Sequence, residues 1–472
     1  MNLHESPIAS KGILDMPNEI LDDFMENLAF SKDVASASLS CRKVHSVAQR
    51  HLYRCIAWDP YLGVFCTALC WDLPAEGCFS GYLPPIDLLL RSFASNADVA
   101  HCVQELSFQF PGRPHGEVNN FKVSKGAPNR LIRSDIENIK QSSRLQAVQE
   151  KEVHWAALES GSGSEIAHIV VLLCANLRRL RISSFYDYPT INPSFIGSLI
   201  EQDPGPLTHV EYLYLQEPIS AECASRVFQF PNLEGLEVSI KSTRTFVWPT
   251  LPLLCAPLLT KLDLLVEHWE PGLLANILSA TPHLQELQYQ FAPWLEGEQD
   301  REDSSTMSLH MDEVYHALLL VAETLQKLEI HVSVGVTSAI DLTWGDYWGM
   351  DHTLGSLASF RALKSMRIPL LGLACGSSPY YSHLQSHLPP NLRSLYLTPD
   401  CHSYETCDLD NRDCLRLLKD LLHNWKVRLP ELQTVGIPRY YQKDMRELFE
   451  QNDHSWDGGL RIVDRLAVWG PV

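Results

Sequence analysis

The stretch ILDMPNEILDDFMENLAFSKDVASASLSCRKVHSVAQRHLYRCI, residues 13 to 56, predicts a compact unit of three short amphipathic helices. Pro17 suits the first turn of a helix, where its missing N–H group costs nothing. Apolar residues recur at helical spacing from Ile20 to Leu28, and Ser31 and Arg42 mark the expected starts of two further helices. A unit of about 40 residues is too small to bury all its apolar side chains alone, so we expect it to need a neighbouring surface.

The same stretch carries the short motifs Met16-Pro17, Glu19-Ile20-Leu21, Leu28, Cys41-Arg42 and Leu52-Tyr53-Arg54. In this pattern it resembles an F-box, although Met16 replaces the usual Leu and Val44 stands where the family commonly has Trp. The resemblance implies docking on the Skp-type adaptor of a cullin-based (SCF) ubiquitin ligase. The residues that it implies for the adaptor face, or for the core that shapes this face, are Met16, Pro17, Ile20, Leu21, Leu28, Leu39, Cys41 and Val44. The alternative interpretation is an ordinary helical cap on the domain that follows.

A second pattern, Leu-x-x-Leu-x-Leu with other aliphatic residues allowed, recurs ten times after residue 100. Alternating leucines predict a short strand with its leucines facing inward, and a preceding Pro-x-Leu ends a helix before several of these strands. From the second motif onward the central residues lie between 23 and 41 positions apart, so some repeats must hold insertions. The central residues of the ten motifs are Leu106, Leu180, Leu213, Leu236, Leu262, Leu287, Leu328, Met366, Leu395 and Val435.

These repeats resemble irregular leucine-rich repeats, which often follow an F-box. One strand and one helix per repeat are not stable singly, so we expect them to stack into a solenoid. The predicted fold is therefore α/β, with a three-helix F-box and then an irregular leucine-rich-repeat solenoid with a short-stranded parallel sheet on its concave face. The expected parts are residues 11–57, a helical bridge over 58–100 and the repeats over 101–472, with insertions at about 111–163 and 296–308. A non-solenoid α/β domain is the alternative.

If the repeats form one sheet, the residues between their leucines form an outward row that we interpret as a target-binding surface. Tyr and Arg are enriched among the residues that dominate binding energy. The alternative is a merely solvated face of the sheet. The predicted target-binding residues are Arg181, Tyr212, Tyr214, Glu237, Asp263, Gln288, Glu329, Arg367 and Tyr396.

Composition narrows the classes of partner. The 472 residues include 38 Lys and Arg against 57 Asp and Glu, a formal charge of −19, which argues against nucleic acid and against anionic membrane surfaces. No apolar run approaches the length of a membrane span. The 13 cysteines form no Cys-x-x-Cys pair, which favours free thiols in the cytoplasm or the nucleus.

Motifs for bond chemistry are missing from the sequence. It contains no Gly-rich phosphate loop, no His-Glu-x-x-His and no Gly-x-Ser-x-Gly, so we expect neither an enzyme nor a cofactor. Cys401, His402, Cys407 and Cys414 lack the tight spacing of structural zinc ligands, so no metal is expected there. The aromatic residues between Asp341 and Met350 either anchor a partner or, as we favour, pack an insertion.

The leading hypothesis is a non-catalytic substrate receptor of an SCF ubiquitin ligase. Its expected partners are a Skp-type adaptor, through it a cullin, and a target protein that the sequence does not identify. The second hypothesis is a repeat-based scaffold without adaptor binding. The third, from a different class, is a hydrolase whose site forms in space on an irregular α/β domain.

Overall fold

The computed structural model describes residues 16–28, 31–59, 64–67, 86–110, 131, 133–141, 155, 158, 163–184, 207–241, 256–292, 308–332, 349–351, 354–374, 387–398, 421, 425–437 and 461–463. The chain forms two compact units, Met1–Glu211 and Tyr212–Val472. Both belong to the α/β class, with largely parallel strands and helices between them. The boundary expected at residue 100 falls inside the first unit.

The first unit begins with three helices, α1 (Asn18–Glu26), α2 (Ser31–Ser38) and α3 (Arg42–Arg54). The helices predicted from residues 13 to 56 are therefore confirmed, and α1 starts directly after Pro17. Their shared core consists of Leu21, Met25, Val34, Val44, Val47 and Ala48. This core holds the unit together because each helix contributes at least one side chain to it.

The rest of the first unit alternates between strands and helices: β1 (Cys55–Asp59), β2 (Val64–Thr67), α4 (Ile86–Ser95), α5 (Ala97–Cys102), β3 (Glu105–Phe110), α6 (Arg133–Gln141), α9 (Gly163–Leu173) and β4 (Arg179–Ser184). The strands are ordered β2-β1-β3-β4, with β1 and β2 antiparallel and the other pairs parallel. The helical bridge predicted over 58–100 therefore contains helices α4 and α5, but Trp58, Asp59 and Val64–Thr67 lie in strands β1 and β2 instead. Trp58 is buried and pairs with Phe108 of β3, a long-range pairing that helical periodicity does not reveal.

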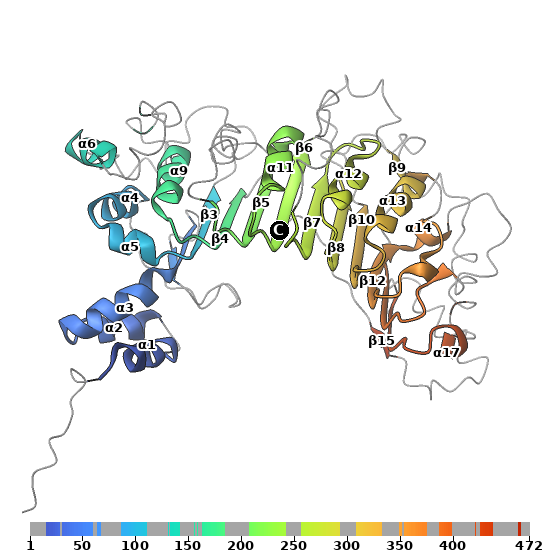
Figure 1. The fold of residues 1–472 in the computed structure, drawn as a ribbon, viewed down its shortest axis with the longest axis horizontal. Coiled ribbons are helices and arrows are strands. Elements are labelled where there is room, and N and C mark those ends of the chain that lie inside the picture. The colour runs from blue at the N-terminus through green and yellow to red at the C-terminus, as the bar shows by residue number, and fades with distance from the viewer. Residues whose placement is uncertain are drawn as a thin grey trace, which may run out of the picture. The chain divides into compact units, whose positions relative to one another are not determined.

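The second unit carries a long parallel sheet ordered β5-β6-β7-β8-β10-β12-β13-β14-β15 and a small parallel pair, β9 and β11 (Figure 1). Helices α11, α12 and α13 lie on one side of the long sheet in this view. The strands are β5 (Tyr212–Ser220), β6 (Gly235–Lys241), β7 (Lys261–Val266), β8 (Glu286–Phe291), β9 (Ser308–His310), β10 (Lys327–Val332), β11 (Gly349–Asp351), β12 (Ser365–Pro369), β13 (Ser394–Thr398), β14 (Thr434–Gly436) and β15 (Arg461–Val463). The helices are α11 (Ala221–Val227), α12 (Leu273–Ser279), α13 (Met311–Leu318), η5 (Leu319–Val321), η7 (Leu357–Ser359), α14 (Leu370–Ala374) and α17 (Trp425–Arg428).

Every one of the ten predicted motifs has its central residue in a strand, so the strand predictions are confirmed. In the second unit the central residues are also in register with one another: Leu213 is opposite Leu236, and the alignment continues through Leu328 to Val435. All of them are buried. Stacked inward leucines thus form a continuous apolar core along the sheet, which stabilises neighbouring repeats together.

The helix expected before the motif of Leu287 is also confirmed, because α12 occupies Leu273–Ser279. Gly272 precedes it with a φ of 78°, a left-handed conformation that glycine adopts without steric cost. The Asp341 to Met350 loop lies outside the described residues except for its last two positions, and the insertion at 296–308 except for Ser308. Their predicted roles stay predictions.

Candidate protein-binding surfaces

The three-helix unit exposes an unusual amount of apolar side chain. Among the described residues, nine large apolar side chains are exposed, and four of them fall between residues 16 and 39. They are Met16 at 40%, Ile20 at 53%, Phe24 at 49% and Leu39 at 86%. Ile20 and Phe24 lie one turn apart on α1, so they share a face of that helix. A single exposed leucine is ordinary, whereas such a concentration in one small unit indicates an unfilled contact surface.

The predicted adaptor-binding residues divide into surface and core. Met16, Pro17, Ile20 and Leu39 are exposed, and Leu28 and Cys41 are partly buried against the helical core. Leu21 and Val44, in contrast, lie inside that core and are almost fully buried. They shape the surface but do not contribute to it, so Val44 acts through internal packing. Phe24 was missed as a surface residue, although its spacing of four from Ile20 is a signal that would have found it.

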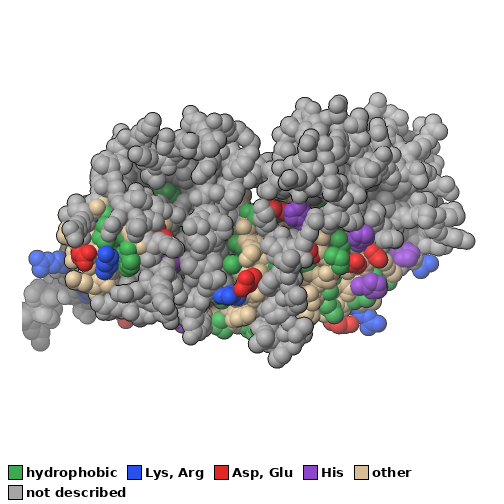
Figure 2. Space-filling model, turned by 90° about the horizontal axis from the view of Figure 1, so that it is seen from above, with side chains coloured by type: hydrophobic (Ala, Val, Ile, Leu, Met, Phe, Trp, Pro, Cys, Tyr) green, Lys and Arg blue, Asp and Glu red, His purple; other side chains and the backbone are tan. Residues whose placement is uncertain are grey.

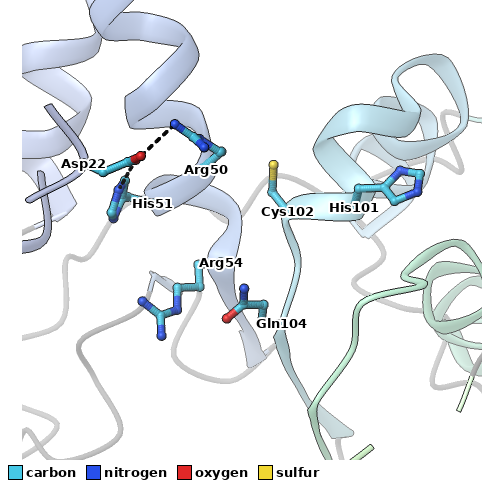
Figure 3. Close-up of a pocket in the computed structure, with 7 residues that line it drawn as sticks. All are labelled: Asp22, Arg50, His51, Arg54, His101, Cys102 and Gln104. Atoms are coloured by element: carbon cyan, nitrogen blue, oxygen red, sulfur yellow. Dashed lines mark hydrogen bonds and ion pairs between the residues drawn. The ribbon is translucent and has the colours of Figure 1, made fainter. Parts of the chain in front are cut away.

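Ion pairs join α1 to α3 beside a pocket of about 390 Å³. Figure 3 shows Asp22 of α1 between Arg50 and His51 of α3, with oxygen–nitrogen distances of 2.9 and 3.1 Å. Arg54 reaches Glu26 at 3.6 Å. The pocket is lined by Asp22, Arg50, His51, Arg54, His101, Cys102 and Gln104. Because Asp22 and both arginines are partly exposed, these pairs orient α1 more than they stabilise it.

The predicted target-binding row is assembled by the register of the second unit. Residue by residue, the paired positions run Tyr214, Glu237, Asp263, Gln288, Glu329, Arg367 and Tyr396. Tyr212 lies two positions before Tyr214 on the same strand and is also exposed. Arg181 lies on β4 of the first unit, opposite Ser107 of β3. The structure therefore aligns these seven residues of the second unit, whereas Arg181 belongs to the first unit.

Glu329 is the centre of an ionic network on this row. Its carboxylate oxygens lie 2.8 Å from Lys327 Nζ, 3.4 Å from His331 Nε2 and 3.6 Å from an Arg367 Nη. The hydrogen bond with His331 and the nearby Lys327 and Arg367 lower the pKa of Glu329 to about 2, against the opposing effect of burial. The carboxylate is consequently held ionised, and it fixes three basic side chains in place.

Asp263 lies two strands away from Glu329, and its environment shifts its pKa in the opposite direction. Burial raises the pKa of Asp263 to about 6, and the charge of Glu329 adds to this effect. The charges of His331, Lys261 and Lys327 oppose the shift. A partly desolvated carboxylate whose pKa is raised is a costly arrangement at neutral pH, which binding sites often retain at the expense of stability.

Two tyrosine rings lie flat against glycine backbone on the same face. A Cβ atom at Gly235 would stand 2.5 Å from a ring carbon of Tyr212, and a Cβ atom at Gly436 would stand 2.5 Å from a ring carbon of Tyr396. The hydroxyl of Tyr212 also donates to Glu234 at 3.1 Å, and the Arg367 guanidinium lies 5.5 Å from the Tyr396 ring centre. The absence of a side chain at each glycine therefore allows the neighbouring aromatic ring to lie on the sheet.

The predicted row consists of residues between two aliphatic positions, together with Tyr212, and it omits Lys261, Lys327 and His331. Each lies two positions from a predicted row residue on the same strand. Successive side chains of a strand alternate between faces, so a step of two keeps the same face. Extending the predicted row by two positions in each direction would have found them.

Seen from above, the second unit shows histidine side chains beside acidic ones (Figure 2). Within the described ranges, no group of three or more His, Cys, Asp or Glu side chains is arranged to hold a metal ion. Cys401, His402, Cys407 and Cys414 lie outside those ranges. Among the described residues, Cys41, Cys55, Cys102, Cys174 and Cys223 form no disulfide with one another.

We expect Asp263→Asn to raise the free energy of unfolding at pH 7 by up to about 3 kcal/mol. The folded-state pKa of about 6 lies above the ordinary value of 3.8, so the wild-type fold loses stability as pH rises through this interval. The gain should therefore vanish below about pH 4. Urea unfolding of both proteins at a series of pH values measures the difference.

Glu329→Gln is the matched control, and we expect it to change the free energy of unfolding in the opposite direction. Its pKa of about 2 lies below the ordinary 4.5, so the carboxylate contributes stability above pH 4.5 that disappears as pH falls through 2. The variant should be less stable than wild type at pH 7 by up to about 3 kcal/mol. Equal behaviour of the two variants at pH 7 would contradict the assignment of opposite environments.

No helix in the described part of the chain is long and apolar enough to cross a membrane. Comparison with models of known protein families finds no match, and no curated protein matches the chain significantly.

Proposed function

We propose that this protein is the substrate-recognition subunit of an SCF-type ubiquitin ligase. The observation that carries the proposal is the concentration of exposed Met16, Ile20, Phe24 and Leu39 on a small three-helix unit whose motifs resemble an F-box. A Skp-type adaptor, itself bound to a cullin, is the partner that would cover these side chains. The aligned outward row of the second unit would then hold the target protein.

In this function the protein makes and breaks no bonds itself. It contributes proximity, because holding a target beside the ligase's ubiquitin-charged partner raises the effective concentration of target lysines near the activated thioester. Rigid strands suit this task, since the row residues are fixed by register to neighbouring strands.

The test is binding of the full chain to a purified Skp-type adaptor. We expect a stable complex in size-exclusion chromatography and a dissociation constant of about 1 μM or tighter by calorimetry. No complex at about 10 μM of each protein would overturn the proposal. In that case the second hypothesis, a repeat-based scaffold without adaptor binding, becomes the explanation for the row of the second unit.

A further inference from the structure

Charged side chains on the open face of the second unit are sorted by sign along the sheet. On residues 235–240 of β6, on β7 and on β8, together with the residue before each strand, the charged side chains are Glu234, Glu237, Lys261, Asp263 and Glu286. Four carboxylates and one ammonium give this half a formal charge of −3. The corresponding set on β10, β12 and β13 is Lys327, Glu329, Lys364, Arg367 and Arg393. Four basic groups and one carboxylate give the other half a formal charge of +3, with His331 neutral.

The ion pairs known among the described side chains of each half leave this polarity intact. Glu329 is the only carboxylate in the basic set, and three basic side chains already surround it. Arg393 lies 4.0 Å from Glu431, but both side chains are more than half exposed, and such a pair contributes little. In the acidic half, Asp263 is partly buried and forms no ion pair with a described lysine. An ammonium or guanidinium group brought by a partner could therefore pair with Asp263.

The distance between neighbouring strands determines how far apart the charged groups of a partner must lie. Neighbouring strands lie about 4.8 Å apart, so the three steps from β7 to β12 span about 14 Å. An extended chain rises about 3.3 Å per residue, so about four residues cover that distance. The rings of Tyr212 and Tyr396 lie on the sheet near the two ends of this charged face and offer apolar area there.

We propose that the open face of the second unit binds an extended protein segment that carries a basic cluster and an acidic cluster about four residues apart. Its basic side chains lie over β6 to β8, and its carboxylates lie over β10 to β13. The inference rests on the proposed function, because it specifies the charge pattern of the target that the receptor would hold. It does not depend on adaptor binding, which involves the other unit.

Labelled synthetic peptides of one composition test this pattern on the full-length protein. Two peptides carry three Lys and three Glu as blocks separated by one neutral residue, so that the block centres lie four residues apart, in the two possible chain directions, and a third alternates Lys and Glu. By fluorescence anisotropy, we expect one blocked peptide to bind at least about tenfold more tightly than the alternating peptide. Added salt should weaken this binding, because the contacts are between partly exposed charges. Equal affinity for all three peptides would overturn the proposal.

Charge reversal on either half tests the position of the site. Glu237→Lys with Asp263→Lys, and separately Lys364→Glu with Arg393→Glu, should each weaken the preferred peptide by at least about tenfold. Lys364 and Arg393 are exposed, so the second variant keeps the test valid if the first one fails to fold. Glu323→Lys, at an exposed position outside the strands, is the matched control and should leave binding unchanged. Unchanged binding in the folded charge-reversal variants would contradict the proposed surface. If the charge-reversal variants still bind the adaptor, the proposed peptide-binding surface is wrong while the proposed receptor function still stands.

Discussion

The double variant Ile20→Ser, Phe24→Ser is expected to weaken adaptor binding by at least about 100-fold while the protein stays folded. Both side chains are about half exposed, and they share one face of α1. Covering them with a partner would remove apolar area from water, and about 3 kcal/mol for two such side chains corresponds to the expected change. Calorimetric titration with a purified Skp-type adaptor measures the loss.

A matched control exists on the second unit. Leu319 and Leu320 are exposed by 41% and 52%, close to the values for the two α1 residues. The double variant Leu319→Ser, Leu320→Ser therefore removes a similar apolar area from a different place and should bind the adaptor like wild type. If both double variants bind equally well, α1 is not the adaptor face. Leu21→Ala does not replace this test, because Leu21 is fully buried and its loss would act through the folding of the unit.

Leu328→Ala is expected to lower the free energy of unfolding of the second unit by about 2 to 5 kcal/mol. Leu328 is fully buried in β10, between Leu287 on β8 and Met366 on β12. Removing its side chain leaves a cavity in the stacked apolar core, and neighbouring repeats depend on that core for stability. Urea unfolding measures the cost, and amide hydrogen exchange should report faster opening of β8, β10 and β12.

Gln288→Ala provides the comparison for this prediction. Gln288 lies on the neighbouring strand but faces outward in the row, so its truncation should change stability by no more than about 0.5 kcal/mol. Adaptor binding should be the same in wild type and in both variants, since the three-helix unit has its own core. A similar cost for Leu328→Ala and Gln288→Ala would contradict the assignment of inward and outward faces.

The local pattern of the sequence determined the secondary structure. Helical spacing between Ile20 and Leu28 predicted α1, and alternating leucines placed all ten central residues in strands. These signals are local, because a helix or strand repeats its side-chain direction every few residues. Local periodicity does not predict strand β1, which begins at Cys55. This strand pairs with β3, about 50 residues later in the chain, and the segment that follows Cys55 was expected to be helical.

The sequence by itself determined that this is an α/β chain with a small helical unit at its start, and it determined which residue of each motif faces outward. Only the tertiary structure decided that Ile20 is exposed while its neighbour Leu21 is buried in the core, because burial depends on what packs against each side of α1. It also placed Glu329 beside Arg367, which is 38 residues away, and gave Asp263 no ion pair among the described side chains. Insertions of unequal length separate the repeats, so only the hydrogen-bonded register of the sheet brings their outward residues into one row.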